Sequence, residues 1–136
     1  MESLVVRPPR PGDAADLARN WIDVARHYAG LDADAFQVPD ADGLVAWFEG
    51  LLRRPRSEDA VWLVAEVDGR VVGDVAARLE LPVEDAARQV VRDVGRVRLY
   101  VDALGVGEAY RRRGVGARLM RAVEEWGATG ARSAPC

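Results

Sequence analysis

An Asp68-Gly69 dipeptide lies between two strand-like runs, residues 61–67 and 70–79, and restricts the available folds more than any other feature of the sequence. Both residues tolerate positive φ, which a two-residue type I′ turn requires at its two central positions. The dipeptide therefore predicts a β-hairpin, and with it an antiparallel portion of a sheet.

Two helices are predicted before the hairpin from their apolar periodicity and their end signals. Residues 4–7 are short, β-branched and followed by two prolines, so they are expected to form a first strand. An amphipathic helix should follow, with Asp13 as a candidate N-cap and Gly30 as a candidate stop. The second helix should begin after either Asp40 or Asp42.

One more strand and one more helix are predicted after the hairpin. In residues 96–106, apolar or small residues alternate with a second set that includes Tyr100, Asp102, Leu104 and Val106, which is typical of a strand with one buried and one functional face. Residues 81–95 fit either a short helix or a strand extension. The last helix is expected to begin at Gly114 and to end at Gly127.

The order of these elements is strand, helix, helix, hairpin, strand, helix, which predicts a single mixed α/β (α+β) domain over residues 1–136. Residues 127–136 contain no long aliphatic side chain, so no further strand is expected there. The domain is therefore expected to be incomplete after about residue 127, with an uncovered sheet edge.

The composition excludes several kinds of chemistry. All 19 basic residues are Arg, so no lysine Schiff base can form, and one His and one Cys are too few for a histidine-rich metal site or an internal disulfide. The net charge of -3 gives no general attraction for nucleic acid or membranes. Without a signal peptide or a membrane-span pattern, a cytoplasmic protein without a metal is expected.

Residues 106–117 combine the end of a strand, a basic turn and the start of a helix. The first N–H groups of a helix have no partner within it and lie at the positive end of its dipole, where they bind phosphate groups. Gly114 and Gly116 let phosphate oxygens approach the backbone, and Arg side chains add charge-assisted hydrogen bonds. The tract therefore predicts a pyrophosphate site.

The hexapeptide Arg111-Arg112-Arg113-Gly114-Val115-Gly116 resembles the acetyl-CoA signature of the GNAT N-acetyltransferases. The segment Leu104-Gly105-Val106 is similar to the end of the family's fourth strand, and Tyr110 to its aromatic residue before the signature. The start of the chain is similar to the family's first strand and helix. The resemblance implies a GNAT-like acyl-CoA N-acyltransferase fold with the order β-α-α-β-β-β-α, truncated at its C-terminal end.

The family's activity implies that an amine attacks the thioester of acetyl-CoA directly. The implied cofactor-binding groups are the backbone of Leu104 to Val106 for the pantetheine and residues 111–116 for the pyrophosphate. The residues concerned are Leu104, Val106, Arg111, Arg112, Arg113, Gly114, Val115 and Gly116.

Asp102 and Tyr100, expected on the same strand face as Val106, are the candidates for removing the ammonium proton. The alternative is that Asp102 pairs with a nearby Arg and Tyr100 packs with its hydroxyl at the rim. Glu80 is a third candidate. His27 and Tyr28 either contact the acceptor or serve ordinary helix packing.

Two functions remain open. The first is an acetyl-CoA-dependent N-acetyltransferase acting on a small-molecule or protein amine, and the second is a non-catalytic, degenerate CoA-binding or interaction module. Nucleic-acid binding through the three arginines is disfavoured in an acidic chain. A homodimer is expected, because a second copy would cover the uncovered sheet edge.

Overall fold

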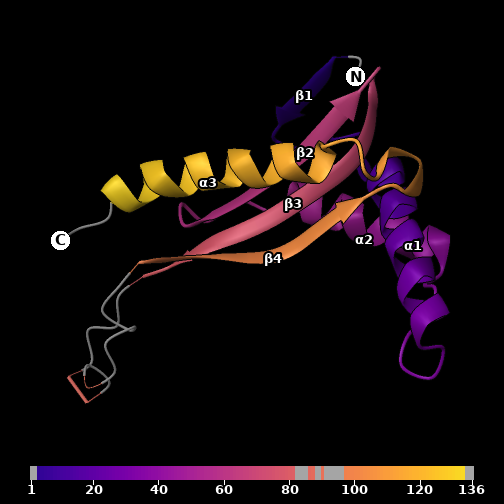
Figure 1. Ribbon diagram of the computed structural model, residues 1–136, viewed down its shortest axis with the longest axis horizontal. Coiled ribbons are helices and arrows are strands. Elements are labelled where there is room, and N and C mark those ends of the chain that lie inside the picture. The colour runs from indigo at the N-terminus through magenta and orange to yellow at the C-terminus, as the bar shows by residue number, and fades with distance from the viewer. Residues whose placement is uncertain (1–2, 82–85, 88–89, 91–96, 134–136) are drawn as a thin grey trace.

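A four-stranded antiparallel sheet forms the centre of the domain in a computed structural model that describes residues 3–81, 86–87, 90 and 97–133. Helix α3 covers one face of the sheet, and α1 and α2 cover the other (Figure 1). The strand order is β1-β2-β3-β4. The elements are β1 Leu4–Arg7, α1 Ala14–Leu31, α2 Ala41–Arg53, β2 Ala60–Val67, β3 Arg70–Glu80, β4 Arg98–Val106, a 3-10 turn Glu108–Tyr110, and α3 Val115–Ser133.

This arrangement confirms the predicted fold class and the predicted order of elements. The hairpin is also confirmed, because Val67 pairs with Arg70 across a turn in which Asp68 and Gly69 have φ of 52° and 80°. Residues 81–95, for which a helix and a strand extension were both open, lie largely outside the described residues.

The helix ends agree only partly with the expected signals. Asp40 is the cap of α2, because its Oδ2 accepts a hydrogen bond of 2.7 Å from the Gly43 amide. Asp13 directly precedes α1, but its side chain makes no cap hydrogen bond. Asp13 is therefore the N-cap residue by position, as predicted, but its carboxylate accepts from Arg7 and from the Arg10 amide rather than from an amide of the helix.

Helix α3 does not end at Gly127, as predicted, but continues to Ser133. Gly127 is buried against strand β4, where an added Cβ would lie 3.3 Å from the side chain of Leu99. The glycine therefore permits close packing of the helix on the sheet rather than stopping the helix.

Strand β4 contains a bulge. Ala76 pairs with Ala103, but Ala77 pairs with Val101, so Asp102 is an extra residue in β4 that has no partner position in β3. A bulge of this kind shifts the two-residue alternation of side chains by one position.

The bulge separates residues that were expected to share a face. Val101 and Val106 both pack against the α3 side of the core, although Val106 is the fifth residue after Val101 and strict alternation would place the two on opposite faces. Tyr100 pairs with Arg78 on the opposite face. The prediction that Asp102 and Tyr100 share a face with Val106 is therefore wrong, because Asp102 is itself the extra residue and shifts the alternation between Tyr100 and Val106.

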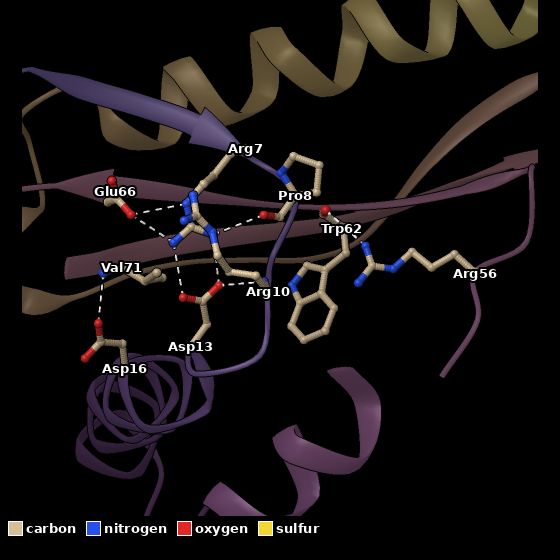
Figure 2. A network of polar contacts seen from close by, with 9 residues as sticks. All are labelled: Arg7, Pro8, Arg10, Asp13, Asp16, Arg56, Trp62, Glu66 and Val71. Carbon is tan, nitrogen blue, oxygen red and sulfur yellow. Dashed lines mark hydrogen bonds and ion pairs between the residues drawn. The ribbon is translucent and has the colours of Figure 1, made fainter. Parts of the chain in front are cut away.

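A polar network around Arg7 joins β1, β2 and the start of α1 (Figure 2). The Arg7 guanidinium forms ion pairs of 2.9 Å with Asp13 and with Glu66. Burial by itself raises the pKa of Asp13, but the hydrogen bonds from Arg7 and from the Arg10 amide outweigh it and hold the pKa below its usual value. The ionised network therefore stabilises the folded state above the usual Asp range, and this contribution is lost as pH falls through the lowered pKa.

We expect Arg7→Met to lower the free energy of unfolding by about 3 kcal/mol, because it leaves a nearly buried carboxylate without its partner. The side chains of Arg7 and Asp13 are only 12% and 10% exposed. Arg19→Met is the matched control, because Arg19 is 45% exposed in its ion pair with Asp16 and should cost less than about 1 kcal/mol. Urea unfolding at pH 7 measures both, and equal effects would contradict the role of Arg7.

Candidate active site

The turn between β4 and α3 presents unpaired backbone donors. The Gly114 carbonyl accepts from the Arg118 amide at 3.1 Å and so begins the helix. Within the part of the chain that the structure describes, no hydrogen bond engages the N–H groups of residues 112–117. Free N–H groups at the start of a helix favour an anion.

The two glycines of the turn leave the approach to these amides open. Gly114 has a φ of 82°, which disfavours any side chain with a Cβ, although an added Cβ would meet no protein atom within 4 Å. A Cβ at Gly116 would lie 3.9 Å from the nearest Val106 carbon, which is ordinary contact. Glycine is therefore favoured at position 114 by the backbone conformation and not by contacts with other protein atoms. A side chain there would also obstruct a ligand that approaches the amides.

The three arginines of the turn are held differently. Arg111 donates from Nε to the Val106 carbonyl at 3.0 Å and so ties the turn to the end of β4. The Arg113 guanidinium lies 5.7 Å from the centre of the Tyr110 ring. Arg112 is exposed, has a φ of 65°, and makes no ion pair or hydrogen bond with the described residues. Arg111 therefore shapes the turn, while Arg112 is available to a ligand.

Strand β4 leads directly into this turn and is one of the two edge strands of the described sheet. Leu104 and Val106 pair with Val75 and Gly73 of β3 on one side of the strand. On its other side, β4 has no neighbouring strand among the described residues, so backbone groups there lack a strand partner and can meet a ligand, except for the Val106 carbonyl, which Arg111 engages.

A pocket of about 630 Å³ lies on the face of the sheet that α3 does not cover, between α1, α2 and strands β2 to β4. Large apolar side chains dominate its walls, and small residues of β3 and β4 form its floor. The wall residues include Trp21, Leu44, Trp47, Phe48, Leu51 and Trp62, and the floor residues include Ala76, Ala103 and Gly105.

Asp74 of β3 lines this pocket. The indole Nε1 of Trp62 donates to its Oδ2 at 2.9 Å. Burial raises the pKa of Asp74 to about 6, and the Trp62 hydrogen bond only partly opposes this rise. A carboxylate with such a pKa is largely ionised at pH 7 yet more basic than an ordinary Asp, which suits a general base.

The second oxygen of Asp74, Oδ1, is not fully buried, although the carboxyl group as a whole is largely buried. No hydrogen bond to Oδ1 is found within the described ranges, and none of their fully buried polar side-chain atoms lacks a partner. Oδ1 must therefore be accessible. Asp74 was not among the residues singled out from the sequence, although a lone carboxylate within the otherwise apolar run Val71 to Ala77 is a signal that could have found it.

The predicted catalytic residues lie beside this pocket in a set of ion pairs. Arg78 binds Asp102 at 3.2 Å, and its guanidinium lies 4.5 Å from the centre of the Tyr100 ring. Glu80 pairs with Arg98 at 2.9 Å. Asp102 thus pairs with an Arg, which was the alternative to its role in removing the ammonium proton. Asp102 nevertheless also lines the pocket.

His27 and Tyr28 lie away from the pocket walls. The Tyr28 ring stacks on Phe36 with 5.1 Å between centroids, and His27 contacts the edge of Tyr28. Neither lines the pocket between α1, α2 and the sheet. These contacts agree with the helix-packing interpretation.

The comparisons with known proteins identify the family. The model of the acetyltransferase (GNAT) family matches residues 18–132, so the chain belongs to the GNAT acetyltransferase family. No curated protein sequence matches the chain. Among the described residues, no helix has the length and apolar character needed to cross a membrane, and no cluster of three metal-ligating side chains occurs.

Solved structures share the fold at low sequence identity. A variant of the BH1408 protein from Bacillus halodurans has a TM-score of 0.71 at 18% identity, covering 92% of this chain and 75% of that one. An integron cassette protein from Vibrio cholerae has a TM-score of 0.68 at 17% identity, with 96% and 72% covered. A ribosomal-protein-alanine N-acetyltransferase from Brucella melitensis has a TM-score of 0.57 at 22% identity, with 94% and 74% covered.

Proposed function

We propose that the protein transfers the acetyl group of acetyl-CoA to a primary amine. The observation that carries this proposal is the set of unpartnered amides at residues 112–117, placed directly after an edge strand in a chain of the GNAT family. In this proposal those amides and Arg112 bind the diphosphate, and the backbone of Leu104 to Val106 holds the pantetheine along β4.

The reaction requires an unprotonated amine and a stabilised oxyanion. Asp74 accepts the ammonium proton through its free Oδ1, the amine nitrogen attacks the thioester carbon, and a C–N bond replaces the C–S bond. The CoA thiolate leaves, and the second proton, which the amine nitrogen loses as the amide forms, passes through water to the thiolate. A backbone N–H of β4 near the bulge stabilises the oxyanion. Asp102 and Tyr100 are secondary candidates, because Arg78 contacts both.

Thiol release from acetyl-CoA over a panel of primary amines tests the activity. We expect release that depends on the amine and exceeds the rate without an acceptor. Calorimetric titration with acetyl-CoA and with CoA is run in parallel. Binding of both without amine-dependent release would contradict catalysis and support the non-catalytic CoA-binding module.

A further inference from the structure

The pocket on the α1/α2 face combines mainly apolar and aromatic walls with a carboxylate. Its walls carry Trp21, Trp47 and Trp62 together with apolar residues of α2, while Asp74 supplies a carboxylate on the sheet side. A polyhydroxylated or polycationic ligand would require many polar partners to replace its water. These walls instead suit a ligand with an apolar body.

The charges around the pocket are partly neutralised. Arg78 pairs with Asp102, which removes that carboxylate as a free anion. Arg56 lies with its guanidinium 5.1 Å from the centre of the Trp62 ring and donates to the Trp62 carbonyl, as Figure 2 shows. Among the described residues, the neutral indole of Trp62 is the only hydrogen-bond donor to Asp74, so the Oδ1 of Asp74 is the group best placed to receive a cation.

The size of the pocket and its position both fit an acceptor. A volume of about 630 Å³ holds a small molecule with an aromatic ring, and the aromatic walls attract both a ring and an ammonium group. The floor residues Ala103 and Gly105 belong to β4, so a ligand on this floor lies beside the strand that leads to the phosphate turn. An added Cβ at Gly105 would lie 3.3 Å from Val24 Cγ2 and 3.8 Å from Asp74 Oδ1, so the glycine lets α1 pack closely beside the floor of the pocket.

We propose that this pocket binds a primary amine with an apolar body of about one aromatic ring, the ammonium group on Asp74 and the body against the tryptophans. The inference rests on the proposed function, because it names the acceptor class of the same site. It excludes aminosugars and other polar amines as the preferred acceptors.

Titration of the full chain with four matched probes tests the inference without any variant. Phenethylamine supplies both features, 2-phenylethanol lacks the charge, glucosamine lacks the apolar body, and 3-phenylpropionate reverses the charge. Binding is followed by calorimetry and by quenching of tryptophan fluorescence, with and without saturating CoA. We expect phenethylamine to bind at least about tenfold more tightly than each of the others.

Asp74→Asn should remove the preference for phenethylamine over 2-phenylethanol. Asp42→Asn is the matched control, because it makes the same change in net charge at an exposed residue outside the pocket and should keep that preference. Equal binding of glucosamine or 2-phenylethanol by the unmodified protein, or a preference that survives Asp74→Asn, would overturn the inference.

The two proposals fail in different ways. Selective binding of phenethylamine with no thiol release from any amine would refute the proposed function and leave the inference standing. Thiol release with polar amines alone would refute the inference and leave the proposed function standing.

Discussion

Asp74→Asn is expected to lower kcat/KM for amine acetylation by about 100-fold or more, the contribution typical of a general base. The substitution keeps an oxygen that can accept from Trp62, so the local hydrogen bond survives. Burial raises the pKa of Asp74 to about 6. The unmodified protein should therefore lose kcat/KM as pH falls through about 6, and the variant should lack this inflection.

Asp74→Asn is expected to lower activity without lowering the stability of the fold at pH 7. Because burial raises the pKa of Asp74, the folded state binds its proton more tightly than the unfolded chain does. Ionisation therefore costs stability as pH rises towards 6, and Asp74→Asn should melt no lower than the unmodified protein at pH 7. Asp102→Asn is the comparison variant, since Arg78 already pairs with that carboxylate and its loss should reduce kcat/KM less. A larger loss for Asp102→Asn than for Asp74→Asn would contradict the assignment of the base.

Gly114→Val is expected to weaken acetyl-CoA binding about 100-fold, equivalent to losing two charge-assisted hydrogen bonds of about 1.5 kcal/mol each. A β-branched residue at a φ of 82° is strained, and its side chain would occupy the approach to the amides. Calorimetric titration with acetyl-CoA measures the change, while circular dichroism verifies that the fold is retained.

Gly12→Val is the matched control for this strain. Gly12 has a φ of 100°, and an added Cβ there would also meet no atom within 4 Å, but Gly12 lies before α1 rather than in the turn between β4 and α3. Both variants should lose about 1–2 kcal/mol of stability, and only Gly114→Val should lose affinity. Unchanged affinity in Gly114→Val would contradict the placement of the site.

Features set by neighbouring residues were predictable from the sequence. The Asp68-Gly69 turn and the turn at Gly114 between β4 and α3 each depend on a few consecutive residues and their φ preferences. The sequence also predicted that Asp40 or Asp42 caps α2, and the structure selects Asp40.

Features set by long-range contacts were not predictable. The extra residue at Asp102 appears only when β4 is paired with β3, so periodicity alone wrongly placed Val106 on the same face as Tyr100 and Asp102. The role of Asp74 depends on Trp62 and on the walls that α2 builds over it, both distant in sequence. The sequence pattern predicts that Gly127 ends the last helix, but its position against Leu99 of β4 shows that it lets the helix pack closely on the sheet. Self-association through β4 stays a prediction, which sedimentation equilibrium can test.

The central claim is that free amides at the start of α3 bind the diphosphate of acetyl-CoA. Calorimetric titration of the unmodified protein with acetyl-CoA and with S-acetylpantetheine, which carries the same thioester but no diphosphate, tests it most directly. We expect acetyl-CoA to bind at least about 100-fold more tightly, with an affinity that falls as salt rises. Equal binding of the two compounds, or no binding of acetyl-CoA at millimolar concentration, would contradict the claim.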